Sequence, residues 1–142
     1  MTEVKRFSLV KPTTQTPFHI DFDWWKQQDK DWRVFLFGFL CQDHQKSLSN
    51  ESTWIDWIDP ETAEVTTVDG LQHVLMSHCA RQEEFITSNT SLVDSVFRAL
   101  LANGNNPLTP IQLSEITTRP PETILRTLSS GVVYKGMRPL QS

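Results

Sequence analysis

Two cysteines and two histidines stand in the sequence as two short pairs, and their side chains have the clearest potential for metal chemistry. Cys41 and His44 are separated by two residues, whereas His78 and Cys79 are adjacent. Thiolate and imidazole groups are ligands that Zn²⁺ prefers, and two of each would complete a tetrahedral site. Adjacent ligands are less usual, because neighbouring side chains on a helix point about 100° apart. The four residues are therefore either ligands of a structural zinc ion or core thiols beside partly exposed histidines.

The first of these pairs follows a segment rich in aromatic residues, for which the spacing predicts a helix. Asp23 is a good N-cap, and side chains recur after it at intervals of three and four residues over about 20 residues. This broad face forms either the domain core or a dimer interface, or both, since aromatic residues are enriched in interface cores. We expect a homodimer. The face consists of Trp25, Gln28, Trp32, Phe35, Leu36, Phe39 and Leu40.

The remaining elements of residues 1–88 predict an α+β unit in the order strand, helix, hairpin, helix. Residues 6–10 are typical of a short strand, and residues 11–17 of a loop. Two β-rich runs, 53–58 and 64–68, flank an Asp-Pro turn and predict a hairpin. A second helix is expected over about 71–82, and it would carry the His78–Cys79 pair.

From Ser91 onward, the start and stop signals of three helices follow one another closely. An apolar stripe over 92–101 follows a possible Ser91–Asp94 capping box and ends at Asn103-Gly104. Thr109, with proline at the next position and glutamine two further on, caps a second short helix. Pro120-Pro121 ends that helix and opens a third, which Gly131 stops. Two short helices joined by a tight turn favour a helix-turn-helix.

Two short extended runs follow, 132–134 and 137–140, around a turn at Lys135-Gly136. With this hairpin as a wing, the segment from Ser91 to Leu140 resembles the winged helix-turn-helix superfamily, and residues 89–142 would form that unit. The resemblance implies binding of double-stranded DNA, with helix 120–130 in the major groove and wing 132–140 on the backbone. By position it places six residues at the DNA: Arg119, Thr123, Arg126, Thr127, Lys135 and Arg138.

The distribution of charge agrees with a DNA-facing C-terminal part. The chain has a net charge of −4. Residues 98–142 hold five Lys or Arg and two Asp or Glu, a net charge of +3, which leaves −7 for residues 1–97. Because Lys and Arg drive phosphate binding, we expect a small transcriptional regulator. The alternative is a winged-helix module for protein–protein interaction or assembly that binds no DNA.

Several other classes of protein are disfavoured by what the sequence lacks. It has no phosphate-binding loop, dinucleotide fingerprint, zinc-protease motif or nucleophile elbow, so we do not expect an enzyme. The longest strongly apolar run, 34–41, is far shorter than the roughly 20 residues that span a bilayer. The first residues have no apolar stretch typical of a secretion signal, so we expect a cytoplasmic protein, no membrane partner, and reduced thiols.

Overall fold

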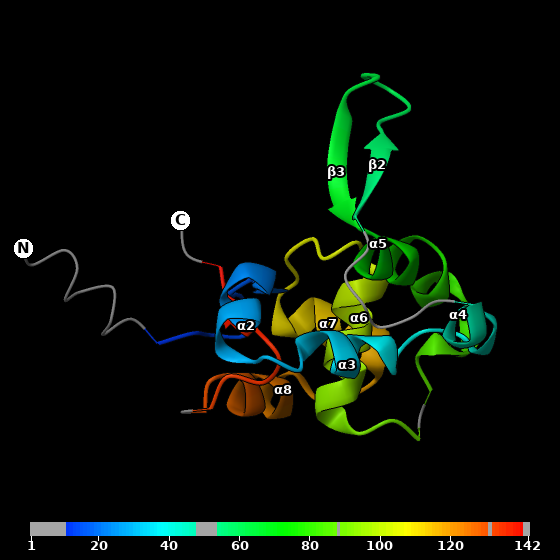
Figure 1. The fold of residues 1–142 in the computed structure, drawn as a ribbon. Coiled ribbons are helices and arrows are strands. Elements are labelled where there is room, and N and C mark those ends of the chain that lie inside the picture. Colours follow the sequence, from blue (N-terminus) through cyan, green and yellow to red (C-terminus); the bar gives the residue numbers. More distant parts are fainter. Residues whose placement is uncertain (1–10, 48–53, 88, 131, 141–142) are drawn as a thin grey trace, which may run out of the picture. The chain divides into compact units, whose positions relative to one another are not determined.

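The computed structural model describes residues 11–47, 54–87, 89–130 and 132–140. It combines helices with short antiparallel strands, as expected for an α+β protein (Figure 1). The strand predicted at 6–10 lies outside the described residues. In chain order the elements are β1 (Phe18–Ile20), α2 (Phe22–Gln28), α3 (Trp32–Phe37), α4 (Gln42–Ser47), β2 (Trp54–Ile58), β3 (Val65–Asp69), α5 (Gly70–Ser77), the 3₁₀ turns η1 (Cys79–Arg81) and η2 (Glu83–Phe85), α6 (Leu92–Ala102), α7 (Pro110–Thr117), α8 (Pro121–Leu128) and β4 (Met137–Pro139).

The chain divides into two compact units, and the first of them is discontinuous in sequence. Unit 1 comprises the described residues of Met1–Trp24 and Ile86–Ser142, and unit 2 is Trp25–Phe85. This division differs from the boundary at 88/89 that we expected from the sequence. The difference arises because β1, near the start of the chain, forms its hydrogen bonds with residues of the C-terminal segment.

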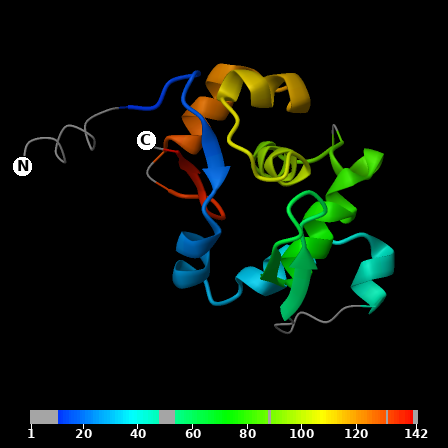
Figure 2. The same cartoon turned by 90° about the horizontal axis from the view of Figure 1, so that it is seen from above.

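The described part of unit 1 contains α6, α7 and α8 and the two-stranded sheet of β1 and β4. β1 pairs antiparallel with β4 along one edge, and Phe18 forms a two-way backbone bridge with Leu108 along the other. Figure 2 shows β1 and β4 side by side. The core side chains of the unit come from all of these elements and include Phe18, Ile20, Val96, Phe97, Leu100, Leu101, Leu113, Ile124 and Met137.

The helix boundaries of unit 1 confirm the predicted box at Thr109 and the cap at Ser91, where one of the two bonds of a capping box forms. The Ser91 side chain accepts a hydrogen bond from the Asp94 N–H, and Thr109 forms a complete capping box with Gln112. Gly104, at φ 68°, ends the turn after α6 in a left-handed conformation. α8 starts at Pro121, as predicted, and it ends at Leu128, before the expected stop at Gly131, a residue outside the described set.

The predicted wing hairpin is wrong. Lys135 and Gly136 do form a tight turn, with positive φ angles and a hydrogen bond from the Met137 N–H to the Tyr134 carbonyl. However, the run before this turn is not a strand, and β4 pairs with β1 instead. Burial explains why β4 pairs with β1 and not with residues 132–134. Met137 packs in the core opposite Ile20, whereas Val132 and Val133 remain exposed.

Unit 2 consists of short helices, 3₁₀ turns and the β2–β3 hairpin, which extends beyond α5 (Figure 1). The hairpin confirms the prediction, with five aligned residue pairs around an Asp59 turn. Around Trp25, which is 2% exposed, aromatic rings pack edge to face, and their centroids lie 5.8 Å away at Phe35 and 6.1 Å away at Trp32. The aromatic face is therefore largely core, and the homodimer stays a prediction.

The single helix of about 20 residues predicted from Asp23 is wrong, since the segment forms α2, α3 and α4. The helix begins earlier, with the Asp21 carboxylate accepting a hydrogen bond from the Trp24 N–H. It is broken at Asp29, whose side chain accepts hydrogen bonds from the Asp31 N–H and the Trp25 indole N–H. A side chain that satisfies backbone donors locally competes with continuation of a helix.

The turn between α7 and α8 contains a strained residue. Thr118 has φ 61° and ψ 20°, a left-handed conformation that is unusual for a β-branched side chain. Asparagine adopts this conformation more readily, so Thr118→Asn is expected to raise the free energy of unfolding by about 0.5–1 kcal/mol. Urea unfolding of the two proteins measures the difference. A destabilised Asn variant would mean that the Thr118 hydroxyl, which donates to the Thr117 carbonyl, outweighs the backbone strain.

Candidate metal centre and candidate nucleic-acid interface

The four candidate metal ligands, which are 34 residues apart or more between the two pairs, come together in unit 2. Their nearest ligand atoms all lie within 4.8 Å of one another. The Cys41 Sγ is 3.5 Å from the Cys79 Sγ, 3.1 Å from the His44 Nδ1 and 3.9 Å from the His78 Nδ1. The Cys79 Sγ is 3.6 Å from the His44 Nδ1. Among the described residues, no other group of three or more such side chains gathers in this way.

Helix ends position both pairs of ligands. Cys41 immediately precedes α4, and its carbonyl accepts the Gln45 N–H, so His44 lies within the first turn and projects back toward the thiol. α5 ends at Ser77, one residue before the second pair. His78 has φ −127° and ψ −63°, which is not helical, and Cys79 begins η1. Because of this break, His78 and Cys79 do not project from one continuous helix, so the 100° separation of neighbouring helical side chains does not apply to them.

The two thiols differ in their surroundings. Cys79 is buried, and Cys41 is partly exposed. Burial raises the pKa of the Cys79 thiol to about 11, and the nearby Cys41 side chain adds to this rise. Without a cation beside it, the Cys79 thiol is therefore protonated near neutral pH and a poor nucleophile. This environment disfavours a catalytic cysteine, whereas a bound metal ion would supply the charge that stabilises a thiolate.

Arg119 and Arg138, two of the predicted DNA contacts, make side-chain contacts that join elements of unit 1. Arg119 donates from its guanidinium to the Thr90 carbonyl, which ties the α7–α8 turn to the start of α6. Arg138 forms an ion pair with Asp21 at 3.1 Å, and its guanidinium lies 5.1 Å from the centre of the Trp24 ring. Both side chains hold elements of unit 1 together, so their role as DNA contacts is weakened.

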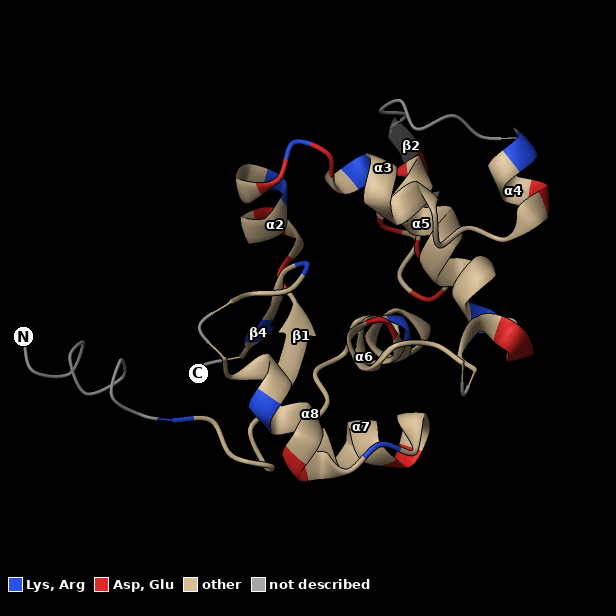
Figure 3. Cartoon of the chain, turned by 90° about the horizontal axis from the view of Figure 1, so that it is seen from below, with Lys and Arg blue, Asp and Glu red and all other residues tan. Residues whose placement is uncertain are grey.

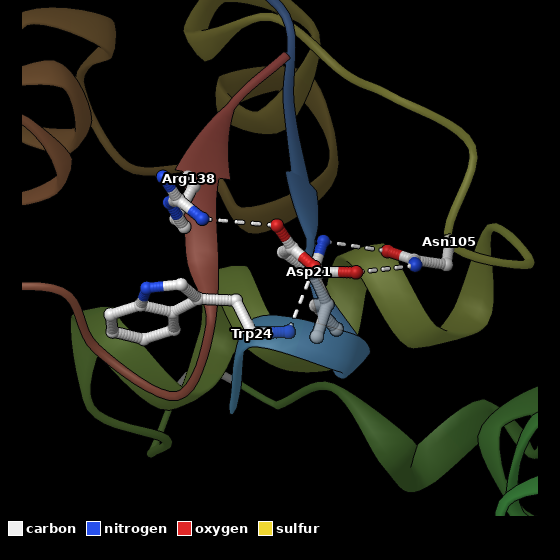
Figure 4. A network of polar contacts seen from close by, with 5 residues as sticks. Asp21, Trp24, Asn105 and Arg138 are labelled. Atoms are coloured by element: carbon white, nitrogen blue, oxygen red, sulfur yellow. Dashed lines mark hydrogen bonds and ion pairs between the residues drawn. The ribbon is translucent and has the colours of Figure 1, made fainter. Parts of the chain in front are cut away.

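Figure 4 shows the network that surrounds Arg138, which includes Asp21 and Asn105, residues not predicted from the sequence to be part of a site. Asp21 accepts from both Arg138 and the Trp24 N–H, so it joins β4 to the start of α2. Asn105 bonds to Ile20 on β1 with its side-chain amide, accepting from the backbone N–H and donating to the carbonyl, both at 2.8 Å. An Asn after Gly104 was a signal for a left-handed turn, but nothing local indicated its distant partner.

The other four predicted contacts lie on α8 and in the turn after it. Arg126 is exposed, and Glu122, also exposed, stands one helical turn before it. Thr123 and Thr127 are partly buried, and the Thr127 hydroxyl donates to the Thr123 carbonyl. Lys135 is partly buried in its turn. In Figure 3, α7 and α8 are mostly tan with isolated blue and red segments, rather than carrying a run of basic residues.

Comparison with known proteins identifies no relative: no protein-family model, curated protein or solved structure matches the chain. Within the described part of the chain, the helices are all too short or too polar to cross a bilayer.

Proposed function

We propose that the protein is a DNA-binding protein rather than an enzyme, and that it acts as a small transcriptional regulator. The observation that carries this proposal is the α7–α8 pair, two eight-residue helices joined by a tight turn and packed on α6. α8 buries Ile124 and Leu128 and exposes Arg126 on its other side. A short helix held in this way is the element that helix-turn-helix proteins insert into the major groove.

The charges of the described residues refine the proposed contacts. An exposed arginine in the middle of α8 is suited to a bidentate contact with guanine or to a phosphate. Lys135, in the turn before β4, is the second candidate for the DNA backbone. Among the candidate DNA contacts, the arginines Arg119 and Arg138 are held by intramolecular contacts, so we expect weak affinity from a single chain. A homodimer that presents two α8 helices to two half-sites would compensate for this weakness.

The test is the salt dependence of binding to DNA selected from random duplexes. Arg126→Ala is expected to lower affinity for the preferred sequence by about 1–3 kcal/mol if a base contact is lost. If the lost contact is to a phosphate, affinity for all sequences should fall and the salt slope should decrease by about one unit. Lys30→Ala, which removes the same charge from an exposed position in unit 2, is the matched control and should bind as the wild type does.

Sedimentation of the free and DNA-bound protein establishes whether two chains bind together. Wild-type protein without any salt-sensitive association, or an Arg126→Ala variant indistinguishable from the Lys30→Ala control, would contradict the proposal.

A protein-interaction module is the second candidate, and a specific observation favours it. α7 exposes two large apolar side chains, Ile111 and Ile116, each 42% accessible. The candidate DNA contacts Arg119 and Arg138, in contrast, make intramolecular contacts. Exposed apolar residues on a helix are suited to a protein partner more than to phosphates. Loss of partner binding on Ile116→Ser, with DNA binding absent in the wild type, would support this function.

A further inference from the structure

We infer that Cys41, His44, His78 and Cys79 bind one structural zinc ion that fastens α4 to the junction of α5 and η1. The four residues lie within unit 2, so this inference is independent of DNA binding by α8.

The ligand atoms lie close to the separations of a tetrahedral zinc site, since all four are within 4.8 Å of one another. With Zn–S of about 2.3 Å and Zn–N of about 2.0–2.1 Å, tetrahedral geometry places ligand atoms about 3.3–3.8 Å apart. The four separations between specified ligand atoms run from 3.1 to 3.9 Å and include both sulfur atoms and both histidines. Packing of two thiols in a hydrophobic core does not by itself require two imidazole nitrogens at these distances. The set of ligand types, Cys₂His₂, is one that structural zinc sites commonly use.

Ligand number separates a structural role from a catalytic one. Four protein ligands fill the coordination of zinc and leave no position for water or substrate. Binding displaces the two thiol protons, so Zn²⁺ and two thiols give a neutral Cys₂His₂ centre and two H⁺. Cys79 is buried and His78 is exposed, so one side of the centre is anchored in the core while the other is open to ion entry.

The small size of unit 2 suggests that a bound ion would contribute to its stability. The unit spans only Trp25–Phe85, and its helices are of six to eight residues apart from the 3₁₀ turns. Domains of about 60 residues bury a smaller share of their surface than larger ones and often depend on metals or disulfides. α4 is exposed at four of its positions, so few apolar contacts hold it. A zinc ion bound by Cys41 and His44 on one side and by the residues after α5 on the other would hold α4 in place.

The experiment uses the full chain, produced without a histidine tag. We expect about one zinc per chain by elemental analysis, and the absorption of tetrahedral, thiolate-bound cobalt after replacement of zinc by Co²⁺. Removal of the metal with a chelator under reducing conditions should lower the melting temperature by at least about 10 °C. Zinc content well below one per chain in protein produced with ample zinc, or no change in melting with chelator, would overturn the inference.

Substitutions of single ligands distinguish the metal from alternatives. His78→Ala is the informative variant, because this exposed side chain is not needed for the core; it should weaken Co²⁺ binding at least about 100-fold. Cys79→Ser should weaken the thiolate-to-cobalt absorption without removing it, because the Cys41 thiolate remains. His73→Ala, on α5 but outside the cluster, is the control and should retain full binding. A His78→Ala variant that binds like the control would contradict the inference. The inference would also be contradicted if the metal-free protein depended for its stability on a disulfide between Cys41 and Cys79.

Discussion

Replacement of Asn105 by Ala is expected to lower the free energy of unfolding by about 2–4 kcal/mol. Two causes combine. The side-chain amide forms two hydrogen bonds with the backbone of Ile20, and each contributes about 0.5–1.5 kcal/mol. Asn105 also has φ 59°, a left-handed conformation that costs alanine about 1–2 kcal/mol. Urea unfolding of the full chain measures the change.

Two further variants separate these causes. Asn105→Gly removes the hydrogen bonds but tolerates the positive φ, so its loss should be smaller than that of the Ala variant. Asn105→Asp keeps an acceptor for the Ile20 N–H and places a second oxygen against the Ile20 carbonyl, so it should destabilise although it tolerates the backbone conformation. An Ala variant within about 0.5 kcal/mol of the wild type would show that Asn105 does not secure β1.

The second large effect is expected at the ion pair between Arg33 on α3 and Asp69 at the start of α5. The Asp69 side chain is 4% exposed and that of Arg33 14%. Asp69 also caps α5 by accepting a hydrogen bond from the Gln72 N–H. Asp69→Ala removes a counter-ion from a mostly buried guanidinium together with the cap, so it should destabilise by about 3–5 kcal/mol. Thermal and urea unfolding measure the loss.

Asp69→Ser is the matched control for the cap. Serine is a good N-cap but carries no charge, so it should recover about 1 kcal/mol of the loss in Asp69→Ala and leave the rest. Full recovery by serine would mean that the ion pair contributes nothing, contrary to this expectation.

The parts of the fold that were predicted correctly are those determined by neighbouring residues. The Thr109–Gln112 capping box, the prolines that open α7 and α8, and the turn after Ile58 each act within about four residues, so their signals are complete in the local sequence. The hairpin and the three C-terminal helices were predicted for this reason.

The errors have a different origin, in contacts between distant residues or in competing local ones. Spacing alone could not show that the Asp29 carboxylate would capture the Asp31 N–H and end α2. Nor could it show that β4 would pair with β1, since the turn at Lys135 favoured the nearer run. Three-residue strands carry too little pattern to identify their partners.

The candidate sites were predicted unequally. The residue types of the four metal ligands identified them from the sequence, although the helix end that lets His78 and Cys79 converge was not predicted. For the proposed DNA contacts, residue type and position could not reveal that Arg138 pairs with Asp21, which is 117 residues away. A basic side chain is informative only once its intramolecular partners are known.

The discontinuity of unit 1 has a consequence for the order of folding during synthesis. β1 leaves the ribosome long before β4, the strand with which it pairs. Arg138 on β4 emerges 117 residues after its ion-pair partner Asp21. At about 5–20 residues per second this interval is about 6–23 s. Unit 2 is contiguous and leaves the ribosome complete within the interval, so it is free to fold first. Until residues 105–108 emerge, the hydrophobic side chains of Phe18 and Ile20 lack their partners in unit 1, so this segment is exposed to aggregation and to binding by chaperones.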